Sequence, residues 1–247
     1  AQRKRLEAAL RADPDNAALL AMQGAILLKS GEAAAAVAAL ERAHALQPDT
    51  EEVQANLGLA LLAAGRTEDG IAALEAAVVR NPAHRAARVA LAKACIETRA
   101  LDQADPHVAA LLLSEPEDAV ALHLRAALLL ERQDYPEAAR ILDGIVAADL
   151  ENRDAWFNLG NALMGMGAHD DAARCLHAAL ILDPTSLPCA LRLAQAHLAR
   201  EDDQSVVACL VQAYRASPQA QPDVPISAFL EARNRPDLGV AVFSTIL

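Results

Sequence analysis

The sequence predicts an all-α fold, a solenoid of stacked antiparallel helix pairs, from two observations. Prolines recur at intervals of 34 residues, with a single leucine in place of one of them. Between successive prolines lie two helical apolar patterns separated by a turn. A helix pair of this length cannot bury its apolar face alone, but stacked pairs can. The ladder is Pro14, Pro48, Pro82, Pro116, Leu150, Pro184 and Pro218.

Composition agrees with a helical core built from small and aliphatic side chains. Hydrophobic residues make up 54% of the 247 residues, but aromatic residues only 2%, so alanine and leucine must fill the core. Both are strong helix formers. We expect one continuous solenoid over residues 1–247, with a half repeat (1–16), six repeats (17–220) and divergent capping helices (221–247).

The first two repeats follow one plan. In the first, we expect helices at Ala17–Lys29 and Ala33–Leu46, with a turn at Ser30–Gly31. Glycine supplies backbone angles that other residues resist, and the proline that follows ends the unit. The second repeat keeps this plan, and Asp49 with Glu52 resembles a capping box at its start.

The third repeat departs from the plan. Arg99 stands where the turn glycine is expected, and Pro106 falls inside the second helix. Asp105 and Pro106 together read as an N-cap and a first helical residue. The pattern therefore predicts that this helix begins late, near Pro106, or is kinked there.

The later repeats vary at the same places. Gln133 and Glu201 replace the turn glycine in the fourth and sixth repeats. Asp134 can cap a helix that has Pro136 in its first turn, and Pro188 suits the first turn of another.

The tail holds two more helical patterns, at about Val224–Asn234 and Pro236–Leu247, outside the repeat spacing. Its denser apolar surface can cover the exposed end of the solenoid. The alternative is a contact with an adjacent domain or with a second copy of the chain.

Two columns of small residues recur, one on each helix of the pair, and larger apolar residues flank them. Small residues let two helix backbones approach closely. The first column is Gly24, Gly58, Ala92, Ala126, Gly160 and Ala194, and the second is Ala36, Gly70, Ala104, Ala138 and Ala172.

The fifth repeat shows the fullest pattern, with Trp156, Leu159, Gly160, Ala172, Leu176, Ala179 and Pro184 in place. With these residues the unit resembles a tetratricopeptide repeat (TPR). The resemblance covers almost the whole chain and implies a right-handed superhelix. It also implies a binding scaffold, although the fold does not name the partner.

In proteins similar to this one, the first helix of each pair lines a concave groove that holds a peptide or a helix. The alternative is that these residues only pack against neighbouring repeats. Carried over by position, the candidate groove residues are Asn56, Leu59, Leu62, Val89, Lys93, Ile96, His123, Leu130, Phe157, Asn158, Asn161, Met164 and Gln195.

Two known subtypes of such grooves fit poorly. One subtype binds a terminal carboxylate through Lys, Asn and Arg side chains on successive repeats, and at the matching positions of this chain only Asn56 and Lys93 are suitable. The other subtype has an asparagine at the same position of each repeat. Asn56 and Asn158 match that position here, but other residues, among them Arg192, occupy it in the remaining repeats.

Several function classes are not indicated. The formal net charge is −11 and no basic face is visible, so we expect no nucleic-acid partner. Motifs for metalloprotease, phosphate-loop and serine-hydrolase chemistry are missing, so we expect no catalytic residues, cofactor or metal. His169 and His177 are interpreted as surface residues. No apolar run is long enough for membrane insertion.

The four cysteines form no CxxC pair, and only Cys175 with Cys189 merits consideration as a bridge. A reducing compartment is favoured, which indicates the cytoplasm, with the periplasm as the alternative.

The resulting hypothesis is a non-enzymatic scaffold that binds a protein or peptide segment in its groove. The half-repeat start and apolar tail favour an alternative, the TPR region of a larger bacterial enzyme such as a glycosyltransferase or hydroxylase. A component of an envelope secretion or polysaccharide-export assembly is a third reading. The excess of arginine over lysine, with abundant alanine, indicates a GC-rich bacterial genome.

Overall fold

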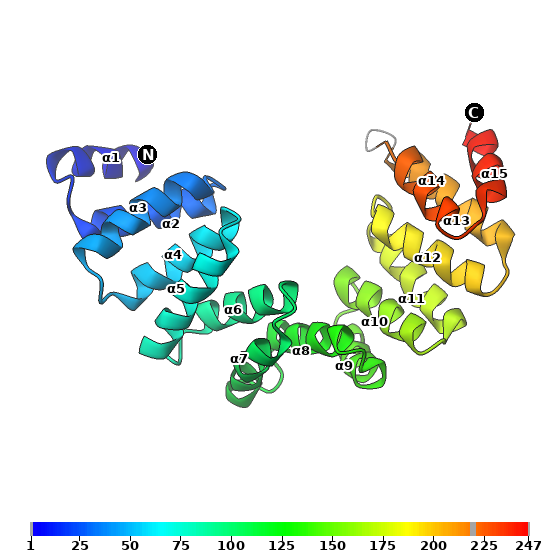
Figure 1. Cartoon of the computed structure of the whole chain (residues 1–247), viewed down its shortest axis with the longest axis horizontal. Helices are drawn as coiled ribbons and strands as arrows, with labels where there is room; N and C mark the ends of the chain where they lie inside the picture. The colour runs from blue at the N-terminus through cyan, green and yellow to red at the C-terminus, as the bar shows by residue number, and fades with distance from the viewer. Residues whose placement is uncertain (1, 218–220, 247) are drawn as a thin grey trace. The chain divides into compact units, whose positions relative to one another are not determined.

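The computed structural model describes residues 2–217 and 221–246, so Pro218, the last proline of the ladder, lies outside the described residues. Fifteen α-helices and no strands are found in the described part of the chain (Figure 1). The all-α solenoid is therefore confirmed. The helices are α1 (Gln2–Ala12), α2 (Ala17–Lys29), α3 (Ala33–Leu46), α4 (Glu51–Ala63), α5 (Thr67–Arg80), α6 (Arg85–Glu97), α7 (Leu101–Ser114), α8 (Ala119–Glu131), α9 (Tyr135–Ala148), α10 (Arg153–Gly165), α11 (His169–Leu182), α12 (Leu187–Ala199), α13 (Asp203–Ala216), α14 (Asp223–Glu231) and α15 (Pro236–Ile246).

The helix lengths follow the repeat. Each of the six pairs from α2–α3 to α12–α13 has a first helix of 13 residues and a second of 14 residues. The pair α2–α3 has the bounds that the sequence predicts. A constant period of this kind places equivalent side chains at equivalent places on every pair.

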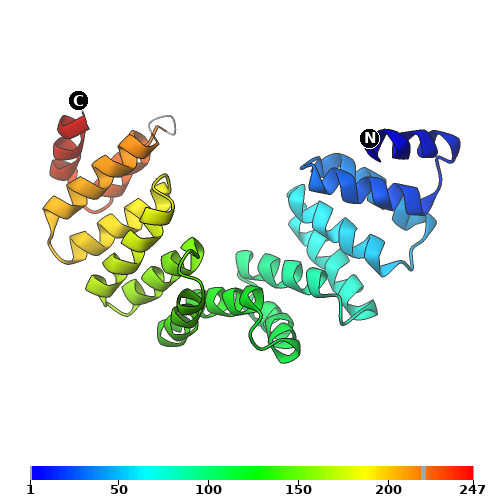
Figure 2. The ribbon, with the colours of Figure 1, turned by 180° about the vertical axis from the view of Figure 1, so that it is seen from behind.

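The chain forms two compact units, Ala1–Leu124 and Arg125–Leu247, which divide within α8. In unit 1 the helices of each pair pack together, and α3 and α5 pack on the first helix of the following pair. In unit 2 the same holds for α10–α11 and α12–α13, and α13 also contacts α15 (Figure 2).

The predicted small-residue columns are sites of close helix contact. A Cβ atom added to Gly24 would lie 2.4 Å from Cγ of Leu40, and one added to Gly160 would lie 2.6 Å from Cγ of Leu176. Both leucines are fully buried. A small residue is therefore found here in every first helix, glycine in three repeats and alanine in the other three, because a side chain of the second helix occupies the space above it.

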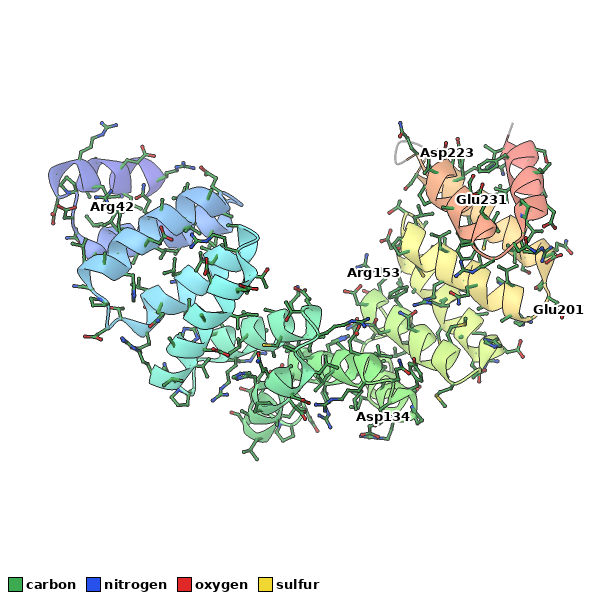
Figure 3. The ribbon with its side chains drawn as sticks, viewed as in Figure 1. Arg42, Asp134, Arg153, Glu201, Asp223 and Glu231 are labelled. Carbon is green, nitrogen blue, oxygen red and sulfur yellow. The ribbon has the colours of Figure 1, made fainter. Side chains whose placement is uncertain are left out.

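All six turns within the pairs share one geometry. The turn residue has a positive φ, 75–78° at the three glycines and 59°, 61° and 58° at Arg99, Gln133 and Glu201. In each turn the following N–H bonds back to a carbonyl near the end of the first helix, as Glu32 does to Leu27 at 2.9 Å. Figure 3 shows Glu201 at the turn between α12 and α13. The residue at this turn position therefore adopts the left-handed backbone conformation even where it is not glycine.

This turn explains why the predicted late start of α7 is wrong. The helix begins at Leu101, with Pro106 inside it. The N–H of Ala100 bonds to the Cys95 carbonyl at 2.8 Å, the same bond as in the other turns. The turn therefore sets the helix start and overrides the local signal of Asp105 and Pro106. Pro106 removes one intrahelical bond and is tolerated.

Two predicted caps also differ. The N-cap of α4 is Thr50, without a side-chain cap bond, so the capping box is wrong. Asp49 lies one residue earlier and instead pairs with Arg80 at 3.1 Å. Asp134 is the N-cap of α9 but its side chain makes no cap bond. Pro136 and Pro188 lie in first turns as predicted.

The tail adds a shortened helix pair to unit 2. Ile226, Phe229 and Leu230 of α14, with Leu238 and Val242 of α15, join the core that contains the sixth repeat. The tail therefore covers the end of this unit. Its outer surface retains Val224 and Val240, whose exposed fractions are 67% and 73%.

The four cysteines are free and buried, so the bridge considered between Cys175 and Cys189 is not formed. Burial raises the pKa of the Cys175 and Cys189 thiols to about 11 and that of Cys209 to about 12. These thiols are core residues.

Candidate peptide-binding face

The first helices of successive pairs lie side by side within each unit. In unit 1, α2 contacts α4 and α4 contacts α6, and in unit 2, α10 contacts α12. We call the outward side chains of α2, α4 and α6 the unit 1 face. We call those of α10, α12 and the end of α14 the unit 2 face.

The candidate residues of unit 1 are mostly engaged in packing. Leu62 lies against Gly70, since a Cβ added to that glycine would meet its side chain at 2.8 Å. Ile96 has an exposed fraction of 9% and belongs to the core. Lys93 is exposed and pairs with Glu97 of its own helix at 3.8 Å. Asn56, with Leu59 and Val89, is half-buried. The unit 1 face therefore offers mainly aliphatic surface and a neutralised lysine.

His123 and Leu130 both lie on α8 and are half-buried. The division into units falls between them, so His123 belongs to unit 1 and Leu130 to unit 2.

The candidate residues of unit 2 fall into two groups. Phe157 and Met164 pack against the buried core, which accounts for much of their surface. Asn158, Asn161 and Gln195 are half-buried polar residues. The Oδ1 atom of Asn161 is buried and has no hydrogen-bond partner among the described residues. Asn161 thus holds an unsatisfied acceptor that neighbouring atoms cover in the unbound chain.

Two arginines meet at Gln195. Its Oε1 atom accepts hydrogen bonds from Nη1 of Arg192 at 3.1 Å and from Nη2 of Arg233 at 3.2 Å. Arg233 also donates to the Phe229 carbonyl at 3.1 Å, and its guanidinium carbon lies 3.9 Å from the centre of the Phe229 ring. We call Arg192, Gln195 and Arg233 the arginine cluster.

The cluster carries uncompensated positive charge. Neither Arg192 nor Arg233 forms an ion pair within the described ranges 2–217 and 221–246. Burial, and then the nearby charge of Arg192, lower the pKa of Arg233. Asp223 and Glu231 mark the two ends of α14 (Figure 3), and Glu231 pairs with neither arginine. The two cations therefore share a neutral amide oxygen instead of a carboxylate.

The sequence indicated Arg192 only as an interruption of an asparagine ladder, and it gave no signal for Arg233. The reason lies in the register of the tail. Asn234 is the left-handed residue there, with φ 56°, and the N–H of Arg235 bonds to Leu230 at 2.9 Å. A turn placed by the 34-residue spacing would fall at Arg235, one residue later, so the position of Arg233 could not be carried over.

A hollow of about 630 Å³ lies between α11 and α12, away from the arginine cluster, and its arginines are paired with aspartates of the same unit. Arg200 pairs with Asp170 at 2.6 Å, and Arg174 pairs with Asp171. His177 is exposed, as predicted, whereas His169 is half-buried.

No group of three or more metal-ligating side chains is found where the chain is described. No helix of the described residues is long and apolar enough to cross a membrane.

Comparison with known proteins identifies the class. Helix pairs of this geometry define an α-solenoid repeat protein. Tetratricopeptide repeat family models match residues 61–128 and 129–185, and another matches residues 3–50, together more than half of the chain. The chain belongs to the tetratricopeptide repeat family. No curated protein matches it.

Several solved structures share the fold at low sequence identity. A tetratricopeptide repeat protein from Parabacteroides merdae is 18% identical with a TM-score of 0.73, and the match covers 96% of this chain and 90% of that one. A chain of the APC/C hetero-tetramer Cut9–Hcn1 is 14% identical with a TM-score of 0.73, covering 92% of this chain and 44% of that chain. YrrB, described as a TPR protein with an unusual peptide-binding site, is 15% identical with a TM-score of 0.61, covering 74% of this chain and 95% of that chain.

Proposed function

We propose that this protein is a non-enzymatic interaction scaffold whose unit 2 face binds a peptide or helical segment of a partner protein. The observation that carries the proposal is the buried, unpartnered Oδ1 atom of Asn161 on that face. An unsatisfied buried acceptor costs free energy, and that cost is removed if the half-buried Asn161 side chain turns outward and its Oδ1 accepts a hydrogen bond from a peptide N–H.

The surroundings of Asn161 suit a peptide. Phe157, Met164 and Leu191 are half-buried aliphatic or aromatic side chains packed on the core of the unit. Their remaining surface can bury apolar side chains of a ligand, while amide groups meet its backbone. Asn161 and Gln195 are one repeat apart, so they occupy equivalent places on α10 and α12, which contact each other.

The fold supports the same conclusion at a coarser level. Tetratricopeptide repeats are generally non-catalytic scaffolds for protein–protein interaction. The likeness to YrrB, described as having a peptide-binding site, adds support at the level of the fold. A role inside a larger enzyme or an envelope assembly would use the same face for a neighbouring domain.

A second contact surface is favoured by the tail. Val224 and Val240 leave apolar surface exposed on α14 and α15. We propose that an adjacent domain or a second copy contacts it. If a second copy contacts this surface, Val240→Asp should lower the molar mass measured by light scattering. An unchanged molar mass would contradict self-association through α14 and α15.

The main test is selection of a random-peptide phage library on the immobilised full chain. Selected peptides are then titrated against matched variants of the two faces, Asn161→Leu in unit 2 and Asn56→Leu in unit 1. We expect Asn161→Leu to weaken binding by about five- to tenfold, the effect of one lost hydrogen bond, and Asn56→Leu to leave it unchanged. Failure to enrich any peptide, or an equal loss in both variants, would contradict the proposal.

A further inference from the structure

The arginine cluster narrows the class of peptide that the unit 2 face can hold. Resting on the proposed function, we infer that the bound segment carries an internal aspartate or glutamate, whose carboxylate is received by Arg192 and Arg233.

The first step is the geometry of the two guanidinium groups. Both lie within hydrogen-bond distance of one oxygen, Oε1 of Gln195, at 3.1 and 3.2 Å. Arg233 is further fixed by the Phe229 carbonyl and by stacking 3.9 Å from the Phe229 ring centre. The two cations are therefore held together before any ligand arrives, which reduces the ordering that binding would otherwise require.

The second step is the supply of free donors. A guanidinium carries five N–H groups in a planar fork. Hydrogen bonds to the described residues engage one nitrogen of Arg192, Nη1, and two of Arg233, Nη1 and Nη2. The remaining N–H groups can bind both oxygens of a carboxylate, which is the planar partner that the fork matches best.

The third step is the contrast with other arginines of the same unit. Arg153 pairs with Asp154 and Asp183, and Arg235 pairs with Asp203 and Asp237. Those arginines are neutralised within the chain. Among the described residues, the polar partners of Arg192 and Arg233 are the amide of Gln195 and the Phe229 carbonyl, neither of which carries a charge. The mutual repulsion of the two arginines is relieved when an anion binds between them.

The fourth step is the choice of anion. The chain has a formal net charge of −11, so any acidic ligand approaches against a repulsive field. A phosphate dianion meets about twice the repulsion of a carboxylate, whereas at physiological salt distant charges are screened over about 8 Å. A single carboxylate in an otherwise apolar segment can bind the two arginines and meets less long-range repulsion from the rest of the chain than a phosphate does.

The cluster also fits the spacing of the face. Asn161 is equivalent in position to Gln195 on the neighbouring first helix. A peptide lying along α10 and α12 can therefore place a backbone N–H against Asn161 and a carboxylate against the arginines.

The test is a double-mutant cycle on peptides from the phage selection, titrated against the full chain by fluorescence anisotropy. The peptide change is Glu or Asp to the amide, and the protein change is Arg192→Gln, with Arg192→Lys as a charge-preserving variant. Arg140→Gln is the matched control, because Arg140 is an exposed arginine of the same unit that pairs with Glu137. Thermal melts by circular dichroism verify that each variant is folded.

We expect the peptide amide to bind wild type about tenfold more weakly, as for loss of a charge-assisted hydrogen bond, and to bind Arg192→Gln no worse than the acid does. The control should behave as wild type, and Arg192→Lys should fall between wild type and Arg192→Gln. Enriched peptides without acidic residues, or the same acid-to-amide loss on wild type and Arg192→Gln, would overturn the inference while leaving the proposed function intact. Tighter binding of a phosphoserine at the same position would overturn the choice of carboxylate. Failure to enrich any peptide would remove both proposals.

Discussion

The first helices of the six repeat pairs have the same length in unit 1 and unit 2, and α2, α4, α6, α10 and α12 each pack against the second helix of their pair, yet the two units present different chemistry. In unit 1 the charged candidate is Lys93, which Glu97 neutralises. Each unit has an unpartnered buried amide oxygen on a first helix, at Gln54 in unit 1 and at Asn161 in unit 2. Unit 2 combines it with two arginines, Arg192 and Arg233, that share one neutral acceptor.

This difference distinguishes residues that pack the repeats together from residues that are available for binding. Packing positions are dictated by the neighbouring helix, so Gly58 faces Leu74 in unit 1 as Gly160 faces Leu176 in unit 2. Positions that point away from the neighbours are free to vary, and function is carried there. The scaffold is common to both units, and the proposed site belongs to one.

The largest effect is expected from filling the close contacts. Gly58→Val and Gly160→Val should each lower the free energy of unfolding of their own unit by about 1–3 kcal/mol, because the added atoms overlap a buried leucine. Trp156, the single tryptophan, reports on unit 2 by fluorescence, whereas circular dichroism reports on both units. In urea titrations Gly160→Val should shift the fluorescence transition and Gly58→Val should shift only the dichroism.

Gly144→Ala is the control for this comparison. No atom lies within 4 Å of a Cβ added there, so the change should stabilise α9 by about 0.5–1 kcal/mol through helix propensity alone. A fluorescence shift caused by Gly58→Val as large as that caused by Gly160→Val would show that the units do not unfold separately.

A smaller effect is expected at the turns. Glu201→Gly in unit 2 relieves a left-handed conformation that costs a non-glycine residue about 1–2 kcal/mol, and the flexibility of glycine offsets part of that gain. We expect the free energy of unfolding to rise by about 0.5–1 kcal/mol, measured as a higher urea concentration at the midpoint of unfolding. The reverse change in unit 1, Gly65→Ala, has open space around the added atom and should destabilise by a similar amount. Equal stability of Glu201→Gly and wild type would mean that the turn is unstrained.

The smallest effect concerns pH. Burial lowers the pKa of His107 in unit 1, with Arg88 lowering it further and Glu75 opposing, and its Nδ1 has no hydrogen-bond partner in the described chain. The unfolded chain then binds this proton at higher pH than the folded one, so stability should fall as pH drops from about 7.5 through about 6.5. His107→Leu should flatten that fall in urea midpoints, and exposed His177→Gln should not. If the fall has the same size in His107→Leu as in wild type, another group causes it, and the half-buried His197 of unit 2 is the next one to examine.

The sequence was sufficient for the scaffold because the scaffold is periodic. The bounds of α2 and α3 and the glycine columns follow from spacing and from the space that a leucine occupies. The start of α7 was mispredicted because a local cap signal at Pro106 competes with a turn that needs Arg99 in a left-handed conformation, and the turn prevails.

The candidate site could be predicted only in part. Asn161 and Gln195 were candidates because of their position in the repeat. The proposed role of Asn161 depends on its missing hydrogen bond, which the repeat spacing does not reveal. Arg233 depends on the one-residue shift at Asn234, and its effect depends on Phe229 and Gln195, which lie far from each other in sequence. Such contacts exist only once the helices are stacked.

The most direct measurement is photo-crosslinking of a selected peptide that carries a benzophenone next to its acidic residue, followed by mass spectrometry of the full chain. We predict crosslinks to residues of α10, α12 and the end of α14, and their loss in Arg192→Gln. Crosslinks concentrated on α4 and α6 of unit 1, or on the second helices of either unit, would contradict the assignment of ligand binding to the unit 2 face.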